Sequence, residues 1–493
     1  RLVEIKRIET ALAVLSWDQG VNMPERATGS RGEVMATLTT LAQDRKSDPA
    51  LGQLLADIDA KSAVSSEVDA RIVQIAKQDY FVAAKVPTSF YARFAQHGGN
   101  TYAAWVKAKK ENDFKSIAPM LAQTVELSRE YSDYFSPEHV LDPLIDRADY
   151  GVKAKWLLPF FSDLRQKLVP LVDRYTSEPP FNDRFLRQPF DPKRQLEFGE
   201  MVVKELGYDF NRGRQDLAPH PFMTRFHAND IRITTRIVED YFGESFFSTV
   251  HEAGHALYEM GINPDYDMTP LGTGTSSAVH ESQSRLWENM VARSRGFWSH
   301  YLPKLKEFFP GQLDEVNLDM MFCAANRVEK TLIRTDADEV TYNLHVLIRT
   351  QLEEDLLTGK LAVKDLPEAW NEAYRESLNV IPQKDSEGVL QDIHWYIDFV
   401  GGMFQGYALG NVIAAQIFHH AVDQLPGVED ELAKGQFQRL HGYLKDNVYR
   451  HGKLYDTFDL VEKVTGNPID AGPYLSYLEQ KYDQVQELKA TSF

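Results

Sequence analysis

Apolar residues recur at helical spacing along most of the chain. Val34, Leu38 and Leu41 stand at positions i, i+4 and i+7, and a four-residue spacing returns near the C-terminus after Pro473. A period close to 3.6 residues places such side chains on one face of an α-helix. Proline and glycine clusters interrupt the pattern, but none of them is long enough to be a flexible interdomain linker. The pattern predicts a mainly α-helical protein.

The segment 222–237, FMTRFHANDIRITTRI, departs from this helical pattern. Two short runs rich in β-branched and aromatic residues flank a turn, where Asn229 and Asp230 favour turn conformations. This arrangement is typical of a β-hairpin. Its second arm ends shortly before the next predicted helix, so we expect a small β element beside that helix.

That next helix, predicted over Phe246–Met260 and ended by Gly261, carries the motif HEAGH. His251 and His255 are four residues apart, so both imidazoles can reach one metal ion about 2 Å from each. Glu252 is rotated by roughly 100° around the helix axis. It is therefore better placed to take a proton from an attacking water than to bind the metal, as in metallopeptidases.

A catalytic zinc site needs a third protein ligand and one open coordination position. A second helix is predicted after a Gly/Thr/Ser-rich loop, with Ser276 or Ser277 as its N-cap. Glu281 lies one turn into this helix, so an antiparallel helix pair can bring its carboxylate to the two histidines. Glu288, seven residues further on, is the competing candidate. His280 receives no role in this interpretation.

Composition excludes several other classes of function. The net charge of −18 repels phosphate backbones and anionic lipid surfaces, so we expect neither nucleic acid nor membrane as a partner. Cys323 is the only cysteine, which excludes an intrachain disulfide and a cysteine metal cluster and suits a reducing compartment. No stretch approaches 18 apolar residues, and the first residues lack a secretory pattern. We expect a soluble, cytoplasmic protein.

These motifs resemble those of the Taq-type zinc carboxypeptidases, a helical family with the shape of a gluzincin and kinship to angiotensin-converting enzyme. The matching motifs are HPF (220–222), DIRITT (230–235), HEAGH (251–255), HESQ (280–283), IRTDAD (333–338) and GVLQDIHW (388–395). The resemblance implies one helical body over 1–493 with a deep central groove and a small hairpin or sheet beside the active site. It also implies a helical cover over 1–100 and a metal and substrate site within 200–410.

Carried over position by position, the resemblance implies that His251, His255 and Glu281 hold the metal and that Glu252 is the general base. It further implies that Arg334 binds the C-terminal carboxylate of the peptide, and that Tyr407 and His394 steady the substrate and its oxyanion.

The second hairpin arm, DIRITT, has a physical role available to it. An exposed edge strand can pair with an extended peptide and hold the scissile bond in register. We expect Arg232 and Thr234 to fix that strand, and we count Arg232 among the substrate-binding residues.

The resulting expectation is a metallocarboxypeptidase that removes single C-terminal residues with broad specificity. We expect one zinc ion per chain, with cobalt or manganese as possible substitutes. Peptides with a free C-terminus are the expected partners, and the resemblance implies a homodimer. One alternative is an oligopeptidase or dipeptidyl carboxypeptidase with the same metal site. The other is a catalytically silent peptide-binding protein, which three ligands and a base argue against, because structural zinc has four protein ligands.

Overall fold

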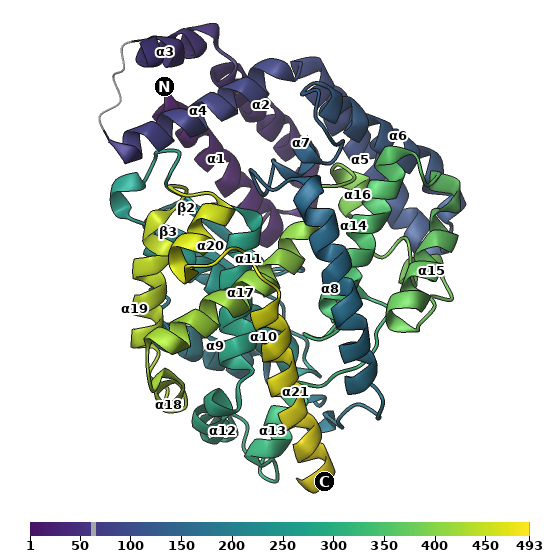
Figure 1. The fold of residues 1–493 in the computed structure, drawn as a ribbon, viewed down its shortest axis with the longest axis vertical. Helices are drawn as coiled ribbons and strands as arrows, with labels where there is room; N and C mark the ends of the chain where they lie inside the picture. Colours follow the sequence, from purple (N-terminus) through teal and green to yellow (C-terminus); the bar gives the residue numbers. More distant parts are fainter. Residues whose placement is uncertain (61–65, 493) are drawn as a thin grey trace.

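The computed structural model describes residues 1–60 and 66–492. Most of the segments in which apolar residues recur at helical spacing are α-helices (Figure 1). The α-helices are α1 (Leu2–Val21), α2 (Thr28–Lys46), α3 (Pro49–Ala60), α4 (Glu67–Lys85), α5 (Thr88–Glu111), α6 (Phe114–Asp133), α7 (Asp142–Ile145), α8 (Ala154–Tyr175), α9 (Pro192–Leu206), α10 (Phe242–Gly261), α11 (Ser277–Arg285), α12 (Arg295–Phe308), α13 (Leu318–Ala325), α14 (Tyr342–Thr358), α15 (Leu366–Leu378), α16 (His394–Ile397), α17 (Gln405–Gln424), α18 (Val428–Leu432), α19 (Gln438–Asn447), α20 (Thr457–Thr465) and α21 (Gly472–Ser492). The mainly α-helical prediction is confirmed.

Single helical turns connect several of these helices. The 3-10 turns are η1 (Glu25–Ala27), η2 (Arg184–Leu186), η3 (Pro264–Tyr266), η5 (Arg334–Asp336), η6 (Val363–Asp365), η7 (Asp385–Glu387) and η8 (Tyr449–His451), and η4 (Leu286–Ala292) is a π-helix that continues α11. Among the residues that the structure describes, no helix combines the length and the apolar composition needed to cross a lipid bilayer.

Capping side chains fix where the helices begin. Asp191 accepts a hydrogen bond of 2.9 Å from the backbone N–H of Arg194 at the start of α9. Ser276 does the same for Val279 at the start of α11, at 3.2 Å, which confirms one of its two predicted caps. Such acceptors satisfy the amide groups that the first helical turn leaves without partners.

The predicted hairpin forms part of a three-stranded sheet. Strands β2 (Met223–His227) and β3 (Asp230–Thr235) are antiparallel, with Met223 opposite Ile233. A further strand, β1 (Gln215–Leu217), pairs in parallel with the other side of β3, so the strand order is β1-β3-β2. The expectation that DIRITT is an exposed edge strand is therefore wrong. Its two edges already pair with β1 and β2, and β1 is too short to show an alternating pattern in the sequence.

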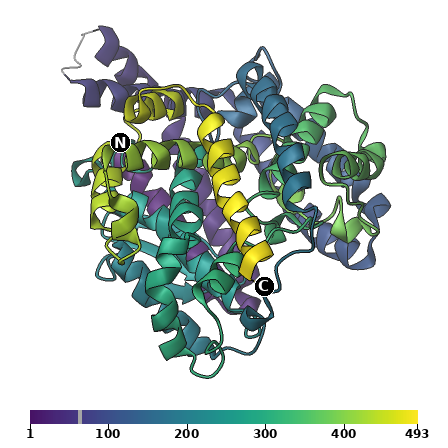
Figure 2. The same ribbon diagram turned by 60° about the horizontal axis from the view of Figure 1, so that its bottom comes forward.

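Helix α10 occupies the centre of the main core. Phe246, Val250 and Leu257 are each at most 1% exposed, and nearly every position of the helix is buried. A helix that is buried on all sides has neighbours on all sides. Helices α9 and α11 and strand β3 pack against it, and Figure 2 shows the C-terminal helix α21 in front of the central helices. The HEAGH motif is therefore held on a rigid element.

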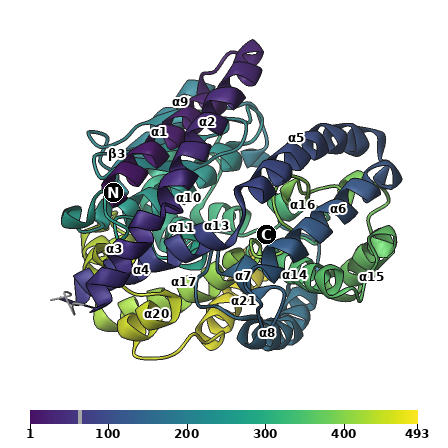
Figure 3. The same ribbon diagram turned by 90° about the horizontal axis from the view of Figure 1, so that it is seen from above.

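Helices α1 to α4 form a separate layer over one side of the molecule (Figure 3). Ile5, Leu51, Leu55 and Ala76 make a small apolar cluster of their own, apart from the main core. Phe90 of α5 belongs to the main core instead. The layer that packs separately thus ends before α5, inside the predicted cover region 1–100, of which residues 61–65 lie outside the described residues.

Candidate active site

Two glycines let three helices approach closely around Glu281. A Cβ atom at Gly254, within HEAGH on α10, would lie 2.6 Å from the Cα of Ser284 and 2.7 Å from the carbonyl oxygen of Gln283. A Cβ atom at Gly410, on α17, would lie 2.6 Å from Cγ of Glu281. Only glycine allows such close backbone approach. Helices α10 and α17 therefore close on two sides of α11 and bring its glutamate to the histidines.

The three predicted metal ligands converge on one point. Oε2 of Glu281 lies 3.6 Å from Nε2 of His251 and 3.4 Å from Nε2 of His255. The three donor atoms all lie within 4.8 Å of one another. Two atoms that each lie about 2.1 Å from a tetrahedral ion are about 3.4 Å apart. Two imidazoles and a carboxylate at these separations therefore fit a zinc-type site.

Glu288, the competing ligand candidate, contacts the other ring nitrogen of His251. Its Oε2 lies 2.9 Å from Nδ1 of His251, and Arg293 donates to its Oε1 at 2.8 Å. Arg285 donates to Oε1 of Glu281 at 2.7 Å and to Oε2 of Glu288 at 3.3 Å. The geometry favours Glu281 as the ligand. Glu288 and Arg285 contact the candidate ligands from outside, in the positions that partners behind metal-binding residues occupy.

Behind His255 lies a second hydrogen-bonded chain. Its Nδ1 is 2.7 Å from Nδ1 of His280, whose Nε2 is 2.9 Å from Oε1 of Glu259. If His255 binds a metal through Nε2, its Nδ1 carries the proton and donates. His280 must then accept at Nδ1 and donate from Nε2 to Glu259. Burial alone would raise the pKa of Glu259, but His280 and Arg225 hold it below its usual value, so Glu259 accepts as a carboxylate.

The hydrogen bonds from His255 through His280 to Glu259 predict a role in metal binding for His280. No role for this residue was predicted from the sequence. Replacing His280 with phenylalanine removes the acceptor for Nδ1–H of His255. We expect zinc affinity, measured by competition with a chelator, to fall about 10- to 100-fold. His419, which is exposed on α17, provides the control, and His419→Ala is expected to leave the affinity unchanged. Unchanged affinity in His280→Phe would contradict the role.

His251 and His255 both contact the Glu281 carboxylate, but their pKa values shift in opposite directions. Burial alone would lower the pKa of His251, but Glu281 and Glu288 raise it to about 10. Burial lowers the pKa of His255 to about 4. Burial would raise the pKa of Glu281, yet Arg285 and His251 hold it well below its usual value. A metal ion bound at the Nε2 atoms takes the place of a proton there, as metal binding to histidine generally does.

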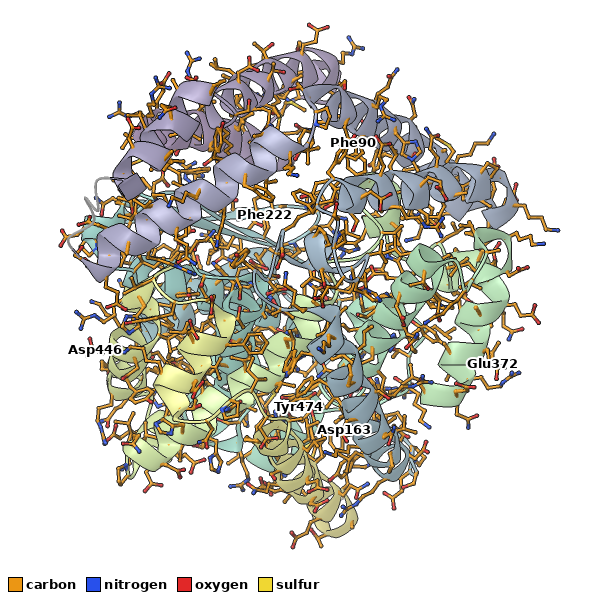
Figure 4. The ribbon with its side chains drawn as sticks, turned by 45° about the horizontal axis from the view of Figure 1, so that its top comes forward. Phe90, Asp163, Phe222, Glu372, Asp446 and Tyr474 are labelled. Carbon is orange, nitrogen blue, oxygen red and sulfur yellow. The ribbon has the colours of Figure 1, made fainter. Side chains whose placement is uncertain are left out.

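A cavity of about 1450 Å³ opens onto these residues. It is lined by His251, Glu252, His255, Glu281, Arg334, Tyr342 and Tyr407, among others. A second cavity of about 1280 Å³ meets it at Ala148, Thr275 and Lys453. The two cavities thus adjoin, and the deep central groove stays a prediction. Phe222, which lines the first cavity, lies at the boundary between the N-terminal helices and the rest of the molecule (Figure 4).

Glu252 stands in this cavity with its carboxylate free. The residue is 7% exposed, and among residues 1–60 and 66–492 none forms a hydrogen bond with its side chain. Burial raises its pKa to about 7, an effect that the positive charge of His251 opposes and the negative charge of Glu281 reinforces. A carboxylate with such a pKa both accepts and releases a proton near neutral pH.

Arg334 and Tyr407 line the same cavity. Arg334 lies on η5 and is 7% exposed. Its Nε and Nη2 donate to Oδ1 of Asp392 at 3.1 and 2.8 Å, and its Nη1 donates to the hydroxyl of Tyr342 at 3.1 Å. The guanidinium carbon lies 5.4 Å from the centre of the Tyr407 ring. The structure therefore brings Arg334 and Tyr407 together with the candidate metal ligands.

Comparison with known proteins decides the family. The model of the family "Carboxypeptidase Taq (M32) metallopeptidase" matches residues 1–482. The chain belongs to this family. It is 37% identical over 498 residues to thermostable carboxypeptidase 1 of Thermus thermophilus and 34% identical over 487 residues to carboxypeptidase 1 of Bacillus subtilis, covering in both cases 98% of this chain and 97% of the relative.

Solved structures agree with the family assignment. The M32 carboxypeptidase from Deinococcus radiodurans R1 is 45% identical, with a TM-score of 0.95 over 99% of this chain and 98% of that one. Metallocarboxypeptidase 1 of Trypanosoma cruzi is 27% identical, with a TM-score of 0.92 over 98% and 97% of the two chains. The protein is therefore an M32 metallocarboxypeptidase, as the resemblance predicted.

Two predicted site residues of this M32 enzyme do not line the cavity of the metal ligands. The ring of His394 lies tilted against that of Phe404, with ring centres 4.9 Å apart, and its buried Nδ1 has no hydrogen-bond partner within the described part of the chain. Arg232 pairs with Asp230 and lies 4.4 Å from the ring centre of Trp17, so it joins the sheet to α1. Their predicted roles in catalysis and substrate binding stay predictions.

The sequence contains a signal for the residues that our interpretation missed. Glu281, Arg285 and Glu288 stand at positions i, i+4 and i+7, which is the spacing of one helix face. Charged residues at that spacing, on a helix expected to face a metal, indicate a network around the ligands rather than a solvated face. His280 and Glu259 carry no comparable signal, because they lie on two different helices.

Proposed function

We propose that this M32 metallocarboxypeptidase removes single residues from the C-terminus of peptides, with broad specificity, and holds zinc through His251, His255 and Glu281. The convergence of these three donors in a cavity that also contains Glu252 and Arg334 carries the proposal. Cobalt and manganese are accepted by the same donor types. A homodimeric assembly, a cytoplasmic location and a covering role for residues 1–100 stay predictions from the sequence.

Glu252 acts as the general base in this proposal. A divalent ion held by the three ligands supplies polarisation of the scissile carbonyl and lowers the pKa of a neighbouring water. The Glu252 carboxylate takes one proton from this water as the water oxygen attacks the carbonyl carbon. It then gives that proton to the amine nitrogen of the leaving residue as the C–N bond breaks. Its pKa of about 7 suits both steps.

Tyr407 stabilises the charge that develops on the carbonyl oxygen in this proposal. Its side chain lines the cavity, and burial raises the pKa of its hydroxyl above the usual range. The hydroxyl therefore keeps its proton at neutral pH and can donate a hydrogen bond to the oxyanion. Donors held ready for this charge are among the largest contributors to catalysis.

Arg334 explains why only the last peptide bond is cut. Its guanidinium is held at the cavity wall, and a planar fork of N–H donors matches a carboxylate in a bidentate arrangement. In this proposal, anchoring the terminal carboxylate at Arg334 directs the last peptide bond to the catalytic groups that line the same cavity. The cavity, at about 1450 Å³, is larger than one side chain fills, which supports broad specificity.

A pair of peptides that differ only at the C-terminus tests this proposal. Both carry a blocked N-terminus, and one ends in a carboxylate while the other ends in an amide. We expect kcat/KM to be about 100-fold lower for the amide, because the amide lacks the charge that Arg334 binds. Initial rates of product release provide the measurement.

The products of the same reactions separate the proposal from its alternative. Mass spectrometry is expected to detect single amino acids from the carboxylate-ended peptide. Release of dipeptides would favour a dipeptidyl carboxypeptidase. Equal cleavage rates for the two peptides would remove Arg334 as the carboxylate anchor.

A further inference from the structure

Behind Arg334 lies a second arginine that does not reach the cavity. Arg349, on α14, has a side chain that is 0% exposed. Its Nε donates to Oδ2 of Asp392 at 2.6 Å, while Arg334 binds the other oxygen, Oδ1. One carboxylate thus joins two guanidinium groups. Both guanidinium carbons also face the ring of Phe404, at 5.4 and 5.6 Å from its centre.

Four of the five N–H donors of Arg349 bind acceptors inside the protein. Its Nη1 donates to the carbonyl of His345 at 2.6 Å and to the hydroxyl of Tyr374 at 3.1 Å, and its Nη2 donates to Oε1 of Gln391 at 2.7 Å. The same Gln391 oxygen accepts the backbone N–H of Arg334 at 2.9 Å. Arg349 therefore acts on the cavity only through Asp392 and Gln391.

Arg334 keeps donors for a ligand. A guanidinium group has five N–H donors. Asp392 takes the one on Nε and one on Nη2, and Tyr342 takes one on Nη1. One N–H on each Nη atom is left, which is the pair that a carboxylate binds in a fork arrangement.

The charges of this cluster do not balance. Within the described residues, Asp392 is the carboxylate that forms an ion pair with either arginine, so two positive charges face one negative charge. Burial lowers the pKa of His394 to about 4, and burial and Arg349 hold the pKa of His345 well below its usual value, so both rings are neutral. Lys109, which donates to the Gln391 carbonyl at 2.8 Å, adds positive charge.

Glu353 is a further acidic group near this cluster, and Asp398 acts on His394 from outside it. Burial raises the pKa of Glu353 to about 7, and its Oε1 accepts from the indole N–H of Trp395 at 2.7 Å rather than from an arginine. The ion-paired group of Arg334, Arg349 and Asp392 is thus net positive. A buried charge without a partner is costly, so the cavity face of Arg334 favours an anion.

We propose that Arg349 is a positioning residue for carboxypeptidase specificity. By sharing the negative charge of Asp392, it leaves Arg334 with a net positive charge, oriented toward the α-carboxylate of the peptide. This inference rests on the proposed role of Arg334 as the carboxylate anchor.

Two substitutions at Arg349 distinguish the effect of its positive charge from the effect of its side-chain shape. The readout is the ratio of kcat/KM for the carboxylate-ended and amide-ended peptides. Arg349→Gln removes the charge, and we expect the ratio to fall at least tenfold through a higher KM for the carboxylate peptide, with kcat unchanged. Arg349→Lys keeps the charge, and the ratio is expected to stay within threefold of the unmodified enzyme.

A matched control lies on α6. Arg129 donates to the carbonyls of Leu357 and Leu356 at the end of α14, the helix that carries Arg349. Arg129→Gln disturbs the packing of this helix without touching Asp392, and its ratio is expected to match the unmodified enzyme. If the ratio of kcat/KM for the two peptides falls equally in Arg349→Gln and Arg349→Lys, the role of Arg349 is structural and the proposal is overturned.

Arg334→Gln distinguishes failure of the inference from failure of the proposed function. If the ratio of kcat/KM for the two peptides is unchanged in Arg334→Gln, the proposed role of Arg334 as the carboxylate anchor is overturned. A ratio lost in Arg334→Gln but unchanged in Arg349→Gln overturns only the role of Arg349.

If Arg349→Gln does not fold, competition by acetate in the unmodified enzyme tests the positive charge around Arg334 and Arg349. Acetate is expected to raise the KM of the carboxylate-ended peptide at least threefold more than that of the amide-ended peptide, because it occupies the positive cluster. Equal inhibition of the two peptides would place acetate at the metal instead. Either equal inhibition or none would overturn the charge imbalance from which the role of Arg349 follows.

Discussion

Replacing Glu252 with glutamine is expected to lower kcat by about 10³- to 10⁴-fold while zinc binding is retained. The amide keeps the shape of the side chain but cannot accept a proton from the attacking water. Glu252 lies outside the trio of converging donors, so its replacement leaves His251, His255 and Glu281 in place. Turnover of the carboxylate-ended peptide and metal content, measured on the same preparation, provide the test.

A glutamate on a neighbouring helix provides the control for this variant. Glu197 lies on α9, which packs against α10, and its side chain is half exposed. Glu197→Gln is expected to keep full activity. If Glu252→Gln retained activity near that of the unmodified enzyme, another group would have to be the base. If it lost its zinc instead, the separation of Glu252 from the ligands would be wrong.

Removal of the metal is expected to abolish activity and to lower the thermal stability. A ligand that binds only the folded state stabilises it by about 4 kcal/mol when present at 1,000 times its Kd. Without the ion, two imidazoles and the buried Glu281 carboxylate lose their common partner. We therefore expect a melting temperature lower by several degrees after chelation, as measured by scanning calorimetry.

Return of the ion completes this test. Zinc, cobalt or manganese added to the chelated enzyme is expected to restore both activity and melting temperature. Glu281→Gln, which weakens the third ligand, is expected to need far more zinc for the same recovery. Full activity in a preparation shown to be metal-free would contradict the proposed chemistry.

Local patterns in the sequence were sufficient for the metal helix and its neighbour. The four-residue spacing of His251 and His255 and the cap at Ser276 depend only on helix geometry, and α10 and α11 form as predicted. Helix α10 begins at Phe242, four residues before the predicted start. Its first turn packs into the core and has no capping side chain, so the sequence carries no cap signal at this position. The hairpin followed from turn residues that act over a few positions.

Features that depend on distant parts of the chain were not predicted. Strand β1 has three residues, and its pairing with β3 is set by the tertiary fold rather than by its own pattern. Which carboxylate faces which nitrogen of His251 depends on the rotation of α11 and on the π-helix η4 that follows it. Asp392 and Arg349 are 43 residues apart, and only the packing of α14 brings them together.

A zinc-loaded crystal structure with anomalous diffraction at the zinc edge tests the proposed metal site most directly. We predict one peak per chain about 2 Å from Nε2 of His251, Nε2 of His255 and a carboxylate oxygen of Glu281, with the Glu252 carboxylate outside bonding distance. A peak bound by Glu288 in place of Glu281, or no peak between the two histidines, would contradict the proposed metal site.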